Sequence, residues 1–157
     1  AGTQMQRVIS STGIKRNWLL GHWGISAPAK MATLFLGAWV DNGTIADLNW
    51  HLFSVTHEPA ITHNNGVAPL TSSWFDGSPR VLNSGLSLDN TPAPADIVFG
   101  GNGVDGSEKS TCEVAEFIMV GAEISDADRQ KIEGYLTKKW GLSAILPSTH
   151  QYKNIAP

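Results

Sequence analysis

Short β-rich runs, separated by turn residues, succeed one another along the first 120 residues of this chain. Apolar and polar residues alternate within them, the pattern of half-buried strands. Gly, Asn and Asp cluster between them, as in Asp41-Asn42-Gly43 and Asp76-Gly77. Strands are expected at residues 4–10, 17–23, 31–40, 48–57, 71–75, 96–99 and 111–120. Evenly spaced strands of this kind predict an all-β fold, an antiparallel sandwich of two sheets.

One helix is expected after these strands. Ser125 is a typical N-cap, and Asp128 stands three residues later, at the capping-box spacing. Acidic residues in the first turn and lysines in the last turn suit the helix dipole. Gly141 has the position of a C-terminal cap, so the helix should span about 126–140. Its buried face is expected to comprise Ile132, Tyr135, Leu136 and Trp140.

Length and charge limit the classes of partner. A chain of 157 residues fits one domain. The net charge is −3 and no run of Lys or Arg occurs, which argues against nucleic acid. No apolar stretch approaches the roughly 20 residues that span a bilayer, so no membrane insertion is expected. The sequence starts with Ala, which suggests a processed chain or a fragment excised from a longer one.

The C-terminal third carries a specific motif, CEVAEFIMVGAEISDADRQKIEGYLTKKWGLSAILPSTHQYKNIAP. This stretch resembles the end of bacterial and phage laminin-G-like domains, which belong to the concanavalin A-like lectin/glucanase family. The matching positions are Ala115-Glu116, Ile124-Ser125-Asp126, Asp128-Arg129, 132–136, Lys139-Trp140-Gly141, Leu146-Pro147 and 150–153. Upstream, the stretches NWLLGHWG, LFLGAWV, NWHLFSVTHE and SSWFDGSP resemble the middle strands of that family more loosely.

The resemblance implies one jelly-roll domain over residues 1–157 and non-catalytic recognition of a carbohydrate, such as a cell-surface glycan. Such a module would belong to a secreted enzyme, an adhesin or a phage fibre, with an extracellular or virion-surface location. The alternative is a structural subunit of a phage capsid, a fibre or an extracellular filament. Similar domains begin with further strands, so the first strand here is expected to pair with a neighbouring subunit or with an absent part of a parent protein.

Catalytic and zinc chemistry find little support in the residues. Glu113 and Glu116 are three apart on an expected strand, so they would point to opposite faces rather than form a glycosidase pair. Glu116 is expected to bond a group near the helix, and Glu113 to be solvated. The five histidines show no zinc-ligand spacing. Cys112, the only cysteine, is expected to be a small buried hydrophobe. We therefore expect no enzyme.

Glycan sites combine an aromatic face with side chains that bond hydroxyl groups. Loops with these features predict a ligand site formed by His22, Trp23, Trp39, Asp41, Asn42, Asn102 and Asp105. Trp74 is a further candidate for exposure, whereas Trp50 and Trp140 are expected in the core. No cofactor is required, although the resembling family sometimes binds structural calcium. Loop oxygens for it would come from Asp41, Asn42 and Asp47, or from Asn102 and Asp105.

Overall fold

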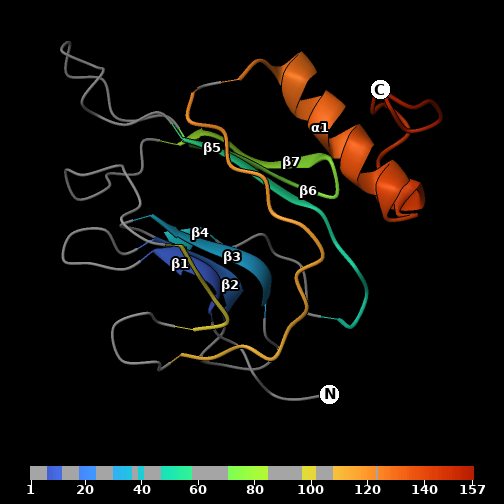
Figure 1. Cartoon of the computed structure of the whole chain (residues 1–157). Helices are drawn as coiled ribbons and strands as arrows, with labels where there is room; N and C mark the ends of the chain where they lie inside the picture. The colour runs from blue at the N-terminus through green and yellow to red at the C-terminus, as the bar shows by residue number, and fades with distance from the viewer. Residues whose placement is uncertain are drawn as a thin grey trace, which may run out of the picture.

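The computed structural model describes residues 7–11, 18–23, 30–36, 39–40, 47–57, 71–84, 97–101, 108–122 and 124–157. Within them, two antiparallel sheets lie one over the other, and a C-terminal helix covers the outer side of the smaller sheet (Figure 1). This arrangement confirms the coarse part of the prediction, a protein made mostly of sheet with a C-terminal helix. In the described part of the chain, no helix is long and apolar enough to cross a membrane.

The larger sheet has the strand order β4-β3-β2-β1-β8. Its strands are β1 (Arg7–Ser11), β2 (Trp18–Trp23), β3 (Lys30–Leu36), β4 (Trp39–Val40) and β8 (Ile97–Phe99). The prediction of one strand over 31–40 is wrong, because β3 and β4 pair antiparallel and the chain reverses between them. Strand β1 pairs with β2 on one side and with β8 on the other. The expectation that the first strand pairs outside the chain is therefore wrong for β1.

The smaller sheet has the order β5-β6-β7, from β5 (Phe53–His57), β6 (Thr71–Phe75) and β7 (Ser78–Ser84). Strand β6 has the predicted bounds, whereas β5 begins five residues later than predicted. A two-residue turn joins β6 to β7, and both of its residues have positive φ, 52° at Asp76 and 73° at Gly77. This is the geometry of a type I′ hairpin, which the Asp-Gly pair favours.

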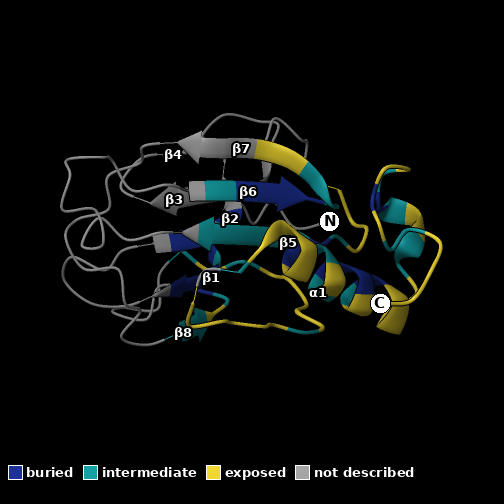
Figure 2. Ribbon diagram, turned by 90° about the horizontal axis from the view of Figure 1, so that it is seen from above, coloured by how far each residue is buried: buried dark blue, intermediate teal, exposed yellow. Residues whose placement is uncertain are grey.

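The side chains of strand β6 pack on both faces of the smaller sheet. Burial is more continuous along β6 than along the other strands (Figure 2). Phe75 packs against Leu20 of β2 and Phe53 of β5, which joins the two sheets. Trp74 faces the opposite way, toward the helix, and is 7% exposed. Trp74, named above as a candidate for exposure, is therefore buried, because α1 covers it.

The helix α1 (Asp126–Lys139) has the predicted caps. The Ser125 hydroxyl accepts a hydrogen bond from the amide of Asp128 at 3.1 Å and donates one to its carboxylate at 2.7 Å. At the other end Gly141 has a φ of 71°, and the amide of Leu142 donates to the carbonyl of Thr137 at 2.7 Å. This hydrogen bond and the positive φ of Gly141 define a Schellman motif, which provides hydrogen-bond donors for carbonyls in the last turn of the helix.

The predicted buried face of α1 is wrong for Tyr135 and Trp140, whereas Ile132 and Leu136 are partly buried. The buried residues are Arg129, Glu133, Gly134 and Thr137. Tyr135 and Trp140 are 43% and 45% exposed, and Trp50, also expected in the core, is 45% exposed. The reason lies in what the helix meets: the guanidinium of Arg129 lies 4.0 Å above the ring centroid of Trp74, a favourable cation–π contact.

The chain after α1 folds back onto the same face and forms what we call the C-terminal clamp: Arg129, Glu133, Gly134, His150 and Tyr152. The Glu133 carboxylate accepts from Arg129 Nη1 at 2.6 Å and from His150 Nε2 at 3.0 Å. A Cβ on Gly134 would lie 2.4 Å from Cβ of Tyr152, so only glycine permits this approach. Residues that carry the family resemblance thus hold the chain end on the helix.

A short 3-10 helix, η2 (Ser143–Ile145), begins this return. Lys153 fixes it, because its ammonium donates to the carbonyls of Ala144 and Leu146, each at 2.6 Å. Leu146 is 2% exposed and lies over the β6–β7 turn, 3.0 Å from the position that a Cβ on Gly77 would take. The return segment therefore links the helix to the hairpin of the smaller sheet.

Candidate functional site

Most of the predicted ligand site lies outside the described residues: Asp41, Asn42, Asn102 and Asp105. His22 and Trp23 end β2, and Trp39 begins β4. Trp23 pairs with Lys30 and Trp39 with Phe35, five residues further along β3. At about 3.4 Å per residue this register separates the two tryptophans by roughly 17 Å along the sheet. The loop site stays a prediction.

Asp47 is the calcium candidate that is described, and its carboxylate is already engaged. One oxygen accepts from the amide of Asn49 at 2.7 Å and from Nε2 of His51 at 3.0 Å. Among the described residues, no group of three or more His, Cys, Asp or Glu side chains is placed to hold a metal ion. A calcium site would therefore depend on the loops outside the described residues.

His51 bridges two carboxylates. Its Nδ1 lies 2.8 Å from Asp76 of the β6–β7 turn, opposite the contact with Asp47, and its ring stacks on Phe75 at 4.7 Å. Burial lowers the pKa of His51, but the hydrogen bonds to Asp47 and Asp76 outweigh it and raise the pKa above its ordinary value. The hydrogen bond from His51 lowers the pKa of Asp47. This group ties the segment before β5 to the hairpin.

A second cluster of polar side chains is exposed to solvent and includes two aromatic residues. We call it the Glu116 cluster: Glu116, Tyr135, Lys139 and Trp140. One oxygen of Glu116 accepts from the Trp140 indole at 2.9 Å and pairs with the Lys139 ammonium at 3.0 Å. Lys139 also donates to the Tyr135 hydroxyl at 3.0 Å. The expectation that Glu116 bonds a lysine near the helix is confirmed, and Glu113 is exposed as expected.

The hydrogen bonds of the Glu116 cluster keep Glu116 negatively charged and Lys139 positively charged near neutral pH. The hydrogen bond from Lys139, followed by that from Trp140, lowers the pKa of Glu116. Hydrogen bonds with Tyr135 and then Glu116 raise the pKa of Lys139. Two rings nearly half exposed thus flank a fixed carboxylate and ammonium, an arrangement that can stack on a sugar and bond its hydroxyl groups.

Beside Tyr135 the surface forms a shallow depression, lined by Lys131, Ile132, Tyr135 and Pro157. Apolar periodicity assigned Tyr135 to the core, so the sequence reasoning missed this surface. A signal was present, because Lys131, Tyr135, Lys138 and Lys139 recur at i, i+4, i+7 and i+8. A face that carries three lysines is unlikely to be buried.

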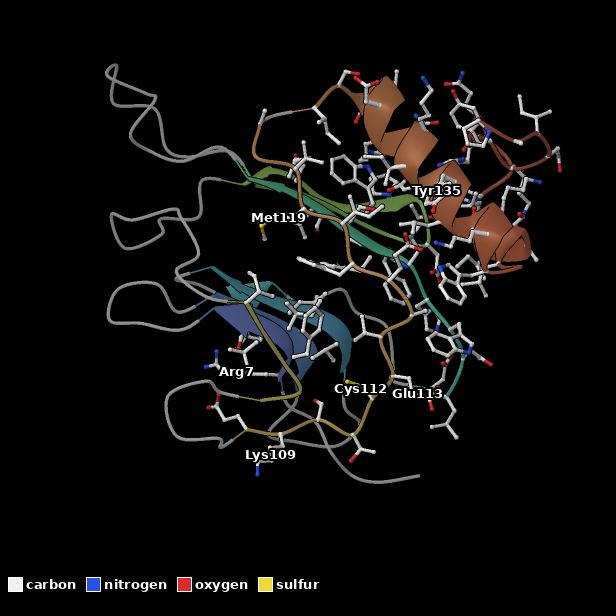
Figure 3. The ribbon with its side chains drawn as sticks, viewed as in Figure 1. Arg7, Lys109, Cys112, Glu113, Met119 and Tyr135 are labelled. Atoms are coloured by element: carbon white, nitrogen blue, oxygen red, sulfur yellow. The ribbon has the colours of Figure 1, made fainter. Side chains whose placement is uncertain are left out.

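The chain between the larger sheet and α1 is a second exposed surface. The prediction of a strand over 111–120 is wrong, because these residues form no strand and join neither of the sheets that the structure describes. It rises from the level of the larger sheet to the helix (Figure 3). The apolar ridge on it comprises Val114, Phe117, Ile118, Met119 and Val120, each more than a third exposed.

Only Phe117 of the apolar ridge has a described ring contact, an edge-to-face packing on Phe99 of β8 with centroids 5.7 Å apart. Cys112, expected to be buried, is exposed at the start of this segment. The strand prediction failed because it assumed a partner in a sheet, and among the described strands none pairs with this segment. The prediction for Cys112 failed because it rested on the usual burial of free cysteines.

Comparison with known proteins brings no significant match, neither to a family model nor to a curated protein nor to a solved structure. The resemblance to laminin-G-like domains therefore stays a prediction from the sequence, and the assignment of function rests on the two exposed surfaces.

Proposed function

We propose that this chain is a non-catalytic glycan-recognition module and that it binds through the Glu116 cluster. The observation that carries the proposal is the exposure of Tyr135 and Trp140 on either side of a charged pair, 43% and 45%. Single exposed aromatic residues are common, but two that are exposed together beside a charged pair form the kind of patch that marks a binding site. A jelly-roll order of strands and an extracellular or virion-surface location belong to the same proposal.

The charges of the cluster favour binding over catalysis. Hydrolysis of a glycosidic bond needs two carboxyl groups that face each other across the bond. Glu116 is held by Lys139 and Trp140, with a lowered pKa that makes it a poor general acid. Its fixed charge can instead accept hydrogen bonds from sugar hydroxyls while a ring covers the apolar face of the sugar.

A glycan array with the purified chain tests this proposal, followed by calorimetry on the best ligand. Trp140→Ala and Tyr135→Ala should each weaken binding by about 1–3 kcal/mol, the range known for bases stacked on aromatic side chains. Trp50→Ala is a matched control, because Trp50 is equally exposed, at 45%, but lies outside the cluster. An array without ligands, or equal losses in all three variants, would contradict the proposal.

The apolar ridge favours a second candidate function, that of a structural subunit in a fibre, filament or capsid. Apolar side chains recur along residues 112–120, and none of the strands that the structure describes pairs with this segment. Such a segment is a template for pairing with another strand. If assembly depends on the ridge, sedimentation velocity should show oligomers that Ile118→Lys converts to monomers. A monomeric wild-type chain at all concentrations would exclude this function.

A further inference from the structure

The outward face of α1 carries more positive charge than its neighbours neutralise. Lys131, Tyr135, Lys138 and Lys139 share this face, and all four are exposed. Lys139 pairs with Glu116. Lys131 lies one turn before Tyr135 and Lys138 nearly one turn after it, and neither makes an ion pair with any residue that the structure describes. These two ammonium groups, which have no acidic partner among the described residues, therefore flank the exposed ring.

The acidic residues nearby offset these charges only in part. Asp126 binds Arg129 at 3.2 Å and Glu133 is buried on the opposite face, whereas Asp128 keeps its negative charge while it accepts from the Ser125 hydroxyl. Two carboxylates, those of Asp128 and Glu116, therefore stand against the three lysines of this face. Although the whole chain has a net charge of −3, this face is locally positive. A locally positive surface attracts anionic ligands at moderate ionic strength.

We propose that the glycan bound by the Glu116 cluster is anionic, a polysaccharide with carboxylate or sulfate groups. The ring of Tyr135 and the depression beside it would receive the apolar face of a sugar, and Lys131 or Lys138 would meet its charged substituent. Lysine acts as a compact point charge on a flexible stem, so it accepts either kind of anion. This inference rests on the proposed function and specifies its class of ligand.

Calorimetry with two matched pairs of polymers tests it: polygalacturonate against its methyl ester, and dextran sulfate against dextran. The anionic member of at least one pair should bind about tenfold more tightly, as expected from two exposed charge contacts. The pair that shows the preference assigns the anion as carboxylate or sulfate. Raising NaCl from about 0.05 M to about 0.5 M should remove the preference, because salt screens exposed charges.

The double variant Lys131→Gln, Lys138→Gln should lose the preference for the anion, so that it binds the charged and the neutral polymer of each pair equally. Lys109→Gln removes an exposed lysine outside the helix and should retain the preference. Thermal melting of each variant verifies that it is folded. A preference that survives the double substitution overturns the inference.

Tyr135→Ala separates this inference from the proposed function. Equal affinity for charged and neutral polymers, with weaker binding by Tyr135→Ala, overturns the anion preference alone. Absence of binding to every polymer overturns the proposed function. Binding to phosphatidylserine vesicles that matches the anionic polymers and ignores Tyr135→Ala would show charge attraction without a sugar site, and would overturn the inference.

Discussion

Helix α1 buries charged and polar residues on one face and exposes Tyr135 on the other, and Trp140, which caps the helix, is exposed as well. On the buried face, Arg129 covers the ring of Trp74 and Glu133 binds both Arg129 and His150. On the outward face, Tyr135 lies among three lysines, and both Tyr135 and Trp140 contact Glu116. The difference shows that the partner of a helix face, rather than its average hydrophobicity, decides which residues are covered. Two experiments test this comparison, and a third tests the His51 bridge.

The largest effect is expected for Glu133→Ala, which removes the carboxylate of the C-terminal clamp. Arg129 and His150 would remain buried without their shared partner, and breaking a buried ion pair costs about 3–5 kcal/mol. Chemical denaturation measures the free energy of unfolding. Asp126→Ala is the control, since it removes an exposed partner of the same Arg129 and should cost less than about 1 kcal/mol. Similar losses in both variants would contradict a buried clamp.

A comparison of tryptophans on the two sides of the helix comes next. Trp74→Ala should lower the free energy of unfolding by about 3–5 kcal/mol, because it empties the space beneath Arg129. Trp140→Ala should cost about 1 kcal/mol, the value of its hydrogen bond to Glu116. If Trp140→Ala proved as costly as Trp74→Ala, the outward face of α1 would be buried after all.

The smallest effect concerns the pH dependence set by His51. Its raised pKa contributes stability that is fully present below its ordinary value of 6.5 and is lost as the pH rises through the folded-state pKa. The lowered pKa of Asp47 contributes stability above its ordinary value of 3.8, which is lost as the pH falls further. The bridge should therefore stabilise most between these two values.

Unfolding measured across this pH range for the wild type and for His51→Gln tests the bridge. The difference in unfolding free energy should shrink above the ordinary pKa of His51 and should stay below about 1 kcal/mol, because Asp47 is exposed. A difference that grows toward alkaline pH would show that His51 is neutral in the folded chain.

Local signals predicted more of this fold than long-range ones did. The ends of α1 follow from Ser125, Asp128 and Gly141, and the β6–β7 hairpin follows from Asp76-Gly77, because caps and turns depend on a few neighbouring residues. The predicted apolar face of α1 was wrong because the sequence did not indicate that Trp74 would lie beneath the helix. The segment over 111–120 failed in the same way, since a strand needs a partner that sequence alternation does not identify.

The exposed surfaces were also out of reach of motif reasoning. The tryptophans of the predicted loop site were chosen for their place beside turns, whereas the Glu116 cluster joins residues 19 and 24 positions apart through side-chain contacts. The expectation that Glu116 bonds a group near the helix indicated one of its contacts, and the spacing of Lys131, Tyr135 and Lys138 indicated that Tyr135 is exposed. The lysine spacing was visible in the sequence, but the apolar periodicity of the helix favoured a buried Tyr135.

The C-terminal clamp also bears on the order in which the chain folds. Its contacts join residues close in sequence, 17 positions for Glu133 with His150 and 21 for Gln130 with Gln151. The contact of Ser10 with Gly101 spans 91 positions. Contacts of low sequence separation lose less loop entropy and form sooner. The helix and its returning tail should therefore acquire structure within the denatured ensemble before β1 meets β8, and the larger sheet should set the overall folding rate.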